Sequence, residues 1–111
     1  MKIALVDDKD YWIEQIKNSI PKSFDYDFLY YSSYKDAVNK SFDILFLDYY
    51  LDKDWLTWKD VIWIMDANII IWFSSVQSCN EKLIKEWADF WIQKINWKNN
   101  YELNELMKNI L

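Results

Sequence analysis

Five polar residues each lie at the carboxyl end of a short apolar segment. They are Asp7, Asp8, Asp48, Ser74 and Lys94. We expect them to converge, because ligands bind outside the carboxyl ends of the strands in open α/β sheets. Three carboxylates in one cleft repel one another, so without a cation at least one would have a raised pKa. A hard divalent cation such as Mg²⁺ relieves this repulsion and keeps water and phosphate oxygens as further ligands. A lysine and a hydroxyl opposite the metal would then hold a phosphoryl group.

Each of these residues alone has an ordinary structural explanation. Asp7 and Asp8 would serve equally well to end a strand and begin a helix. Lys94 alone is typical of a solvated surface charge, and Ser74 alone is typical of a loop. Asp48 is harder to explain in this way, because an acid directly after a buried apolar strand costs desolvation energy unless it is paired. The five residues together favour a phosphoryl-transfer site.

The apolar pattern predicts the elements that must position these residues. Five short apolar segments predict strands: Ile3–Val6, Phe28–Tyr30, Ile44–Leu47, Ile69–Phe73 and Phe90–Ile92. The third and fourth segments are apolar throughout, as expected of parallel strands that are covered on both faces. Helical spacing predicts five helices: Ile13–Ile20, a short one at Ala37–Val38, Val61–Met65, Leu83–Trp87 and Leu103–Ile110. Strands and helices alternate, so we predict a (βα)₅ α/β fold with an open parallel sheet and helices on both faces.

Four of the predicted helices begin with a capping pattern. The candidate capping residues, each followed three positions later by an acid, are Ser33, Thr57, Ser78 and Asn99. A short polar side chain at this position accepts a hydrogen bond from a backbone N–H group of the first helical turn. The pattern therefore places helix starts where the apolar spacing also predicts them.

The composition excludes several kinds of chemistry. The chain has 111 residues with no His, no Arg, one Cys and a formal net charge of −5. A single Cys excludes an internal disulfide framework, and the lack of His excludes a Ser-His-Asp triad. Lysines are interspersed with acids, so nucleic-acid binding is not expected. The apolar run Ile69–Phe73, which no other run exceeds in length, is too short for a membrane span. We expect a single cytoplasmic domain over residues 1–111.

With this pattern the sequence resembles a known family. The runs LVDD ending at Asp8 and FLD ending at Asp48, the FSS run at Ser74, and Lys94 are similar to the signature of response-regulator receiver domains, including the stand-alone chemotaxis-type regulators. The resemblance covers essentially the whole chain. It implies a flavodoxin-like three-layer sandwich whose parallel sheet has the strand order 2-1-3-4-5. Because the chain ends directly after the last predicted helix, we expect a stand-alone regulator without an output domain.

The resemblance also implies roles for individual residues. Asp48 would be the phosphoacceptor, which takes a phosphoryl group from a sensor histidine kinase or a phosphotransfer protein. The implied ligands of Mg²⁺ are Asp7, Asp8, Asp48 and the backbone carbonyl of Tyr50. Lys94 would pair with the phosphoryl oxygens, and Ser74 would form a hydrogen bond to one of them. The product is an acyl phosphate, a covalent intermediate of the carboxylate-nucleophile type.

In two-component signal transduction such a receiver acts as a switch. The resemblance implies that the Ser74 loop and an aromatic residue, here Trp91, change position after phosphorylation and alter a protein-interaction face. It further implies a downstream protein target and allows a homodimer on activation, with no direct nucleic-acid or membrane contact. We do not expect an enzyme, but a phosphoacceptor that takes part in its own phosphoryl transfer and slow dephosphorylation.

The sequence departs from the family at a few positions. Ile95 follows Lys94 where the family normally has Pro. The chain has no Gly and eight Trp, and Trp55 and Trp87 occupy positions where the family commonly has Gly. We hypothesise that an in-frame UGA codon that means Gly in the source organism is written here as Trp.

Two other functions stay open on the sequence alone. A phosphorylation-independent pseudo-receiver would use the same fold only as an interaction module, although the intact Asp48, Ser74 and Lys94 argue against it. A phosphohydrolase of the haloacid-dehalogenase type would carry Asp-x-Asp after its first strand. Here Asp48 lies after the third predicted strand and is followed by Tyr49, which does not fit that pattern.

Overall fold

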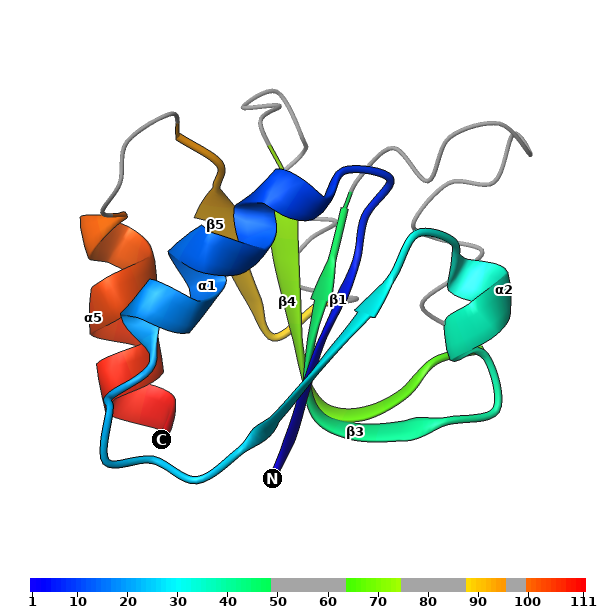
Figure 1. Ribbon diagram of the computed structural model, residues 1–111, viewed down its shortest axis with the longest axis horizontal. Helices are drawn as coiled ribbons and strands as arrows, with labels where there is room; N and C mark the ends of the chain where they lie inside the picture. The colour runs from blue at the N-terminus through cyan, green and yellow to red at the C-terminus, as the bar shows by residue number, and fades with distance from the viewer. Residues whose placement is uncertain (49–63, 75–87, 96–99) are drawn as a thin grey trace.

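In the computed structural model, which describes residues 1–48, 64–74, 88–95 and 100–111, five strands form one sheet (Figure 1). The strands are β1 (Lys2–Val6), β2 (Asp27–Tyr31), β3 (Ser41–Leu47), β4 (Asp66–Ser74) and β5 (Phe90–Gln93). All neighbouring strands pair in parallel, in the order β2-β1-β3-β4-β5. The predicted fold class and the strand order 2-1-3-4-5 are therefore confirmed.

The central strands are buried on both faces. The last four residues of β1 and the last four of β3 are all buried. Such strands must be apolar at successive positions, because helices cover both faces of a parallel sheet. β2 lies at one edge of the sheet and is only half-buried, which fits its mixture of aromatic and charged residues. The apolar runs of the sequence thus correspond to the strands that carry the candidate site.

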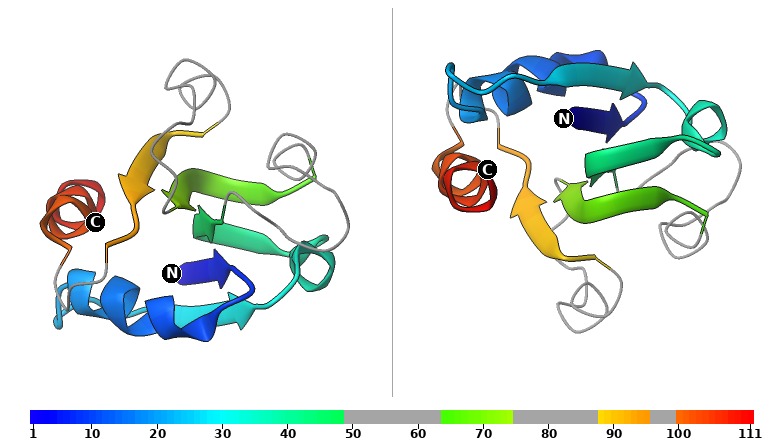
Figure 2. Two further views of the ribbon diagram at one scale, coloured as in Figure 1. Left: turned by 90° about the horizontal axis from the view of Figure 1, so that it is seen from above. Right: turned by 90° about the horizontal axis from the view of Figure 1, so that it is seen from below.

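The described helices lie on both sides of the sheet. A short 3-10 helix, η1 (Asp10–Trp12), leads into α1 (Ile13–Ser19), and the chain ends in α5 (Tyr101–Ile110). α1 and α5 lie side by side on one face, and α2 (Tyr34–Ala37) lies on the other (Figure 2). Most of the helix predicted over Val61–Met65 lies outside the described residues, as does all of the one predicted over Leu83–Trp87.

Two hydrophobic cores separate these layers. Alternate residues of a strand point to opposite faces, so β1, β2, β3 and β4 each contribute to both cores. The core under α1 and α5 contains Leu5, Phe46, Phe73, Ile92 and Met107, among other residues. The core on the α2 side contains Ala4, Val6, Leu45, Leu47 and Met65, among others. Because the two cores flank one sheet, they fix the relative positions of the strand ends.

Two helix starts test the predicted capping residues. Ser33 caps α2, since its hydroxyl accepts a hydrogen bond from the Lys35 N–H at 3.3 Å. The cap of α5 is Asn100 and not the predicted Asn99, because Asn100 Oδ1 accepts a hydrogen bond from the Leu103 N–H at 3.2 Å. Adjacent asparagines are equivalent as caps in sequence, and here burial of Leu103 sets the register of the helix. Thr57 and Ser78 lie outside the described residues.

One residue takes a backbone conformation that glycine would favour. Among the residues that the structure describes, Asn39 is the one non-glycine residue with a positive φ, at 71°. Asn tolerates the left-handed region better than most residues, so it replaces glycine in the turn between α2 and β3. Trp55 and Trp87, where the sequence suggested lost glycines, lie outside the described residues. The recoding hypothesis therefore stays a prediction.

Candidate functional site

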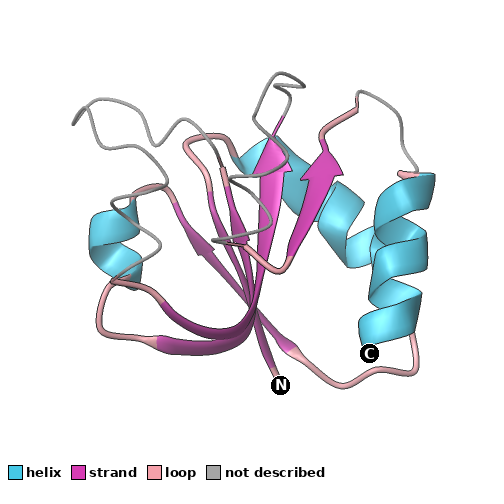
Figure 3. Ribbon diagram, turned by 180° about the vertical axis from the view of Figure 1, so that it is seen from behind, coloured by secondary structure: helices cyan, strands magenta, loops and turns pink. Residues whose placement is uncertain are grey.

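The strand order brings the predicted carboxylates together. Asp7 follows β1 and Asp48 follows β3, and these two strands are neighbours in the sheet. The arrowheads of the parallel strands point toward the same edge of the sheet (Figure 3). One oxygen atom from each of Asp7, Asp8 and Asp48 lies within 4.8 Å of the others. Asp7 is fully buried, Asp48 is 8% exposed, and Asp8 is exposed to solvent. The cluster is therefore open to solvent at Asp8 and closed at Asp7.

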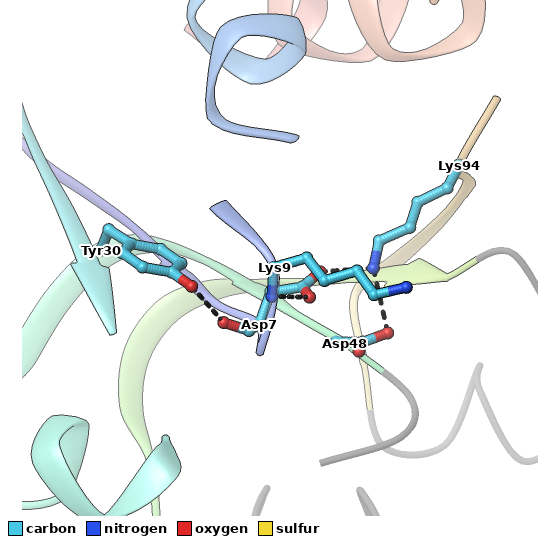
Figure 4. Close-up of polar contacts among 5 residues, drawn as sticks. All are labelled: Asp7, Lys9, Tyr30, Asp48 and Lys94. Atoms are coloured by element: carbon cyan, nitrogen blue, oxygen red, sulfur yellow. Dashed lines mark hydrogen bonds and ion pairs between the residues drawn. The ribbon is translucent and has the colours of Figure 1, made fainter. Parts of the chain in front are cut away.

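Lys94 reaches the acidic cluster from the end of an edge strand of the sheet. It follows β5, and its ammonium Nζ is paired with Asp7 Oδ2 and, at 3.1 Å, with Asp48 Oδ1 (Figure 4). Only 8% of Lys94 is exposed. Asp7, Asp48 and Lys94 are in phase with strand residues that face α1 and α5, which explains why their side chains meet. The arrangement holds three carboxylates against one buried cation.

Burial and neighbouring charge together raise the pKa of Asp7 from 3.8 to about 6. Burial has the largest effect and the negative charge of Asp48 adds to it, while the hydrogen bond and the charge of Lys94 lower the pKa. The sequence predicts a raised pKa for at least one of three clustered carboxylates, and Asp7 is that residue. The site is thus short of positive charge.

The donor set fits a hard divalent cation. Carboxylate oxygens from three residues lie close together, and Mg²⁺ prefers oxygen ligands of this kind. A cation at this place would offset the negative charge that raises the pKa of Asp7. Tyr50, whose carbonyl the family resemblance adds to this set, lies outside the described residues.

The backbone and aromatic side chains hold Asp7 in place. Its Oδ1 accepts a hydrogen bond from the Lys9 N–H at 3.0 Å, and its backbone carbonyl accepts one from the Tyr30 hydroxyl at 2.8 Å. Its own N–H donates to the Tyr31 carbonyl at 3.1 Å. Burial, together with the negative charge of Asp7 and of its acidic neighbours, raises the pKa of Tyr30, so this hydroxyl keeps its proton. Asp7 is therefore fixed through both its side chain and its main chain.

Two aromatic rings lie next to the ammonium group of Lys94. Its Nζ is 5.3 Å from the ring centre of Trp12 and 5.6 Å from that of Phe73. The rings of Trp12 and Phe73 meet edge to face at 5.8 Å. Such contacts stabilise a cation while they exclude water. Trp12 had no predicted role, although its place four residues after Asp8 at a helix start would have suggested that it reaches this end of the sheet.

The backbone on both sides of Lys94 is held by two buried amides. Gln15 Nε2 donates a hydrogen bond to the Ile95 carbonyl at 2.9 Å, and Asn100 Nδ2 donates one to the Gln93 carbonyl at 2.9 Å. Asn100 Nδ2 also donates to Gln15 Oε1 at 3.2 Å. No sequence pattern indicated these contacts, because they join residues up to 85 positions apart. Like every peptide bond among the described residues, the one between Lys94 and Ile95 is trans.

The remaining predicted residues lie on neighbouring strands. Ser74 ends β4, where its backbone pairs with that of Gln93 in β5. Trp91 is half-buried in β5 and pairs with Trp72 of β4. Since Ile92 faces α1 and α5, Trp91 faces the opposite side of the sheet. Trp91 therefore lies on the other face from Lys94.

Solved structures with the same architecture are receiver domains. The response regulatory domain of protein mrkE from Klebsiella pneumoniae matches with a TM-score of 0.74 at 13% identity, over 99% of this chain and 94% of that one. The phosphorylated cyanobacterial phytochrome response regulator RcpA matches with a TM-score of 0.65 at 18% identity, over 98% and 89%. The BeF3-activated DrrB receiver domain matches with a TM-score of 0.68 at 14% identity, over 98% and 92%. This chain has the fold of a receiver domain.

The likeness to the receiver fold lies in the structure and not in the overall sequence. The sequence matches no protein-family model and no curated protein. In the receiver fold of this chain, the acidic cluster and Lys94 lie at the carboxyl edge of the sheet. Among the described residues, no helix is long and apolar enough to cross a membrane.

Proposed function

We propose that this chain is a two-component response-regulator receiver that accepts a phosphoryl group on Asp48. The observation that carries the proposal is the pairing of Asp48 with the buried Lys94 at 3.1 Å, beside Asp7 and Asp8. A carboxylate that served only as a helix or strand terminus would not need a buried ammonium partner, because burying that charge costs energy. The same pair is what phosphoryl transfer to a carboxylate requires.

The proposed reaction is a displacement at phosphorus. A carboxylate oxygen of Asp48 forms a bond to the phosphorus atom of a phosphohistidine, and the phosphorus–nitrogen bond breaks. The imidazole leaves with the electron pair of that bond and takes up a proton. The product is an acyl phosphate on Asp48, which adds about 1.5 to 2 negative charges at neutral pH.

The other residues of the site prepare it for this added charge. Lys94 is paired with Asp48, and its ammonium group would pair with a phosphoryl oxygen once the carboxylate is phosphorylated. Asp7 and Asp8, with Asp48, would hold Mg²⁺, which when bound neutralises negative charge on the phosphoryl oxygens. The rings of Trp12 and Phe73 keep the ammonium group away from water.

Two solved structures with this fold support the proposal. One is of phosphorylated RcpA, and the other is of the BeF3-activated DrrB receiver domain. We extend this chemistry to the present chain because its own carboxylates and lysine lie together. We also propose that it serves as a phosphoacceptor and not as a turnover enzyme.

Phosphorylation would then act on protein partners. We propose a sensor histidine kinase or phosphotransfer protein as donor and a downstream protein as target, with Ser74 and Trp91 in the switch. Ser74 ends β4, and Trp91 lies in the adjacent strand β5, which leads to Lys94. A homodimer on activation and a cytoplasmic location belong to the same proposal.

Labelling with acetyl phosphate tests this function. In the presence of Mg²⁺ the chain should gain a phosphoryl group that is stable in acid and labile in base, as an acyl phosphate is. Asp48→Asn should abolish the label, while the control Asp25→Asn, an exposed aspartate away from the cluster, should keep it. An unlabelled wild-type chain would contradict the proposal and favour a pseudo-receiver. Rapid release of phosphate, with turnover, would favour a hydrolase.

A further inference from the structure

The position of Lys94 depends on residues outside the acidic cluster. We propose that Gln15 and Asn100 are positioning residues, which hold the backbone on either side of Lys94 so that its ammonium group reaches Asp7 and Asp48. This inference rests on the proposed function for its kinetic consequence. Its structural content, the placement of Lys94, can be tested without phosphorylation.

The two amide side chains form hydrogen bonds to the backbone immediately before and after Lys94. Asn100 Nδ2 binds the carbonyl of Gln93, and Gln15 Nε2 binds the carbonyl of Ile95, each at 2.9 Å. Gln15 belongs to α1 and Asn100 is the cap of α5, so two separate helices restrain one short segment. Lys94 lies just beyond Gln93, the last residue of β5.

The two amides also fix each other. Gln15 Oε1 accepts a hydrogen bond from Asn100 Nδ2 at 3.2 Å, which sets the Gln15 amide group so that its nitrogen points to Ile95. Asn100 Oδ1 accepts from the Leu103 N–H, which sets its own amide in turn. Gln15 is 7% exposed and Asn100 is 2% exposed. Buried amides are costly unless they are hydrogen-bonded, so this mutual arrangement is held tightly.

The long side chain of Lys94 makes this restraint important. Its ammonium group must meet carboxylates that belong to β1 and β3, while its backbone belongs to the end of β5. A small change in the backbone direction would carry the ammonium group away from Asp48 or into the ring of Trp12. Misplacement of a reacting or charge-stabilising group by about 1 Å can lower a rate by roughly a hundredfold.

A merely structural role for the amides predicts something different. If Gln15 and Asn100 only joined α5 to α1, their loss would lower stability without a selective effect on Lys94. If they position Lys94, their loss should impair phosphorylation while Mg²⁺ binding, which depends on the carboxylates, is kept. The two roles therefore differ in their pattern of effects.

Three variants separate these roles. Gln15→Met removes the hydrogen bonds of the Gln15 amide to Ile95 and to Asn100 at similar side-chain length. Asn100→Ser keeps a capping oxygen for α5 but is too short to reach both of its other partners. Asn104→Ser is the matched control, since it makes the same change within α5, and no hydrogen bond joins the Asn104 side chain to the described residues Gln93, Lys94 and Ile95.

The kinetic readout is labelling by acetyl phosphate with Mg²⁺. We expect Gln15→Met and Asn100→Ser to lower the labelling rate constant about tenfold and the control to leave it unchanged. Mg²⁺ affinity, measured from tryptophan fluorescence, should stay within about twofold in all three. In a Lys94→Met background, Gln15→Met should cause no further loss, because it acts through Lys94. Equal losses with and without Lys94, or a parallel loss of Mg²⁺ affinity, would overturn the proposal.

A second readout does not depend on phosphorylation. The buried ammonium group of Lys94 should give a nitrogen-15 NMR signal that exchanges slowly with water and is absent from Lys94→Met. In Gln15→Met and in Asn100→Ser this signal should shift and exchange faster, while in Asn104→Ser it should not. An unchanged signal in both variants would refute the positioning role. Failure of wild-type labelling with the expected changes in this signal would refute only the proposed function.

Discussion

At the scale of single residues, the candidate site contains more negative than positive charge. Lys94 is buried between Asp7 and Asp48, and a third carboxylate, Asp8, lies beside them. One ammonium group cannot neutralise three acids, and burial together with the negative charge of Asp48 raises the pKa of Asp7 to about 6. A further cation at this place would reduce the repulsion among the three carboxylates.

Replacement of Asp7 should change how stability depends on pH. An acid whose pKa is raised in the folded state contributes its full stability only at low pH, and that contribution is lost as the pH rises through about 6. In EDTA, Asp7→Asn should therefore be more stable than wild type at pH 7.5, by roughly 2 to 3 kcal/mol, and the gain should shrink below pH 5.

Urea unfolding at several pH values measures this difference. Asp25→Asn, at an exposed position, serves as the control and should show no such trend. A loss of stability in Asp7→Asn at pH 7.5 that shrank as the pH fell would mean that the pKa of Asp7 is lowered by Lys94 and not raised by burial. The charge balance described above would then be wrong.

At the scale of elements, the connections matter as much as the strands. The end of β5 is held by side chains from α1 and from the cap of α5, and the turn after α2 depends on Asn39. These connections carry no apolar periodicity, and each relies on one polar residue. Because the chain has no glycine, other residues must form these connections.

Asn39 gives a direct test of this point. Because its φ is 71°, Asn39→Gly should leave stability unchanged or raise it slightly, since glycine adopts this conformation without strain. Asn39→Ala should cost about 1 kcal/mol, because a Cβ atom disfavours the left-handed region. Urea unfolding of the two variants compares them at one exposed site. Equal stability of the glycine and alanine variants would show that this turn takes another conformation.

Local patterns predicted the elements but not the contacts between them. The apolar runs predicted all five strands, and Ile16 and Ile20 indicated the buried face of α1. The same runs placed Asp7 and Asp48 at strand ends, so that the acidic cluster followed from the parallel topology. The cluster could be predicted because every strand of a parallel sheet points its carboxyl end to one edge.

The rest depended on contacts between distant residues. The cap of α5 was predicted one residue too early, because two adjacent asparagines look alike until packing chooses between them. Gln15 carried no signal, since a glutamine in a helix is ordinarily solvated and its partner Ile95 is 80 residues away. The aromatic contacts of Lys94 with Trp12 have the same origin in tertiary packing.

At the scale of the whole molecule, the fold places the candidate site and the N-terminus at opposite edges of the sheet. The N-terminus lies at the edge of the sheet opposite to the carboxyl ends of the strands, so a tag placed there would be far from Asp48 (Figure 1). The core under α1 and α5 extends up to Lys94 through Phe73 and Trp12. The proposed reaction would therefore take place on top of this core.

The central claim is that Asp48, among 18 acidic residues, is the one that accepts the phosphoryl group. Borohydride reduces an aspartyl phosphate to homoserine, which peptide mass spectrometry can locate. After treatment with acetyl phosphate and Mg²⁺, we predict homoserine at position 48 alone, and none when EDTA is present. Homoserine at Asp7 or Asp8, or none at all in the folded protein, would contradict the account.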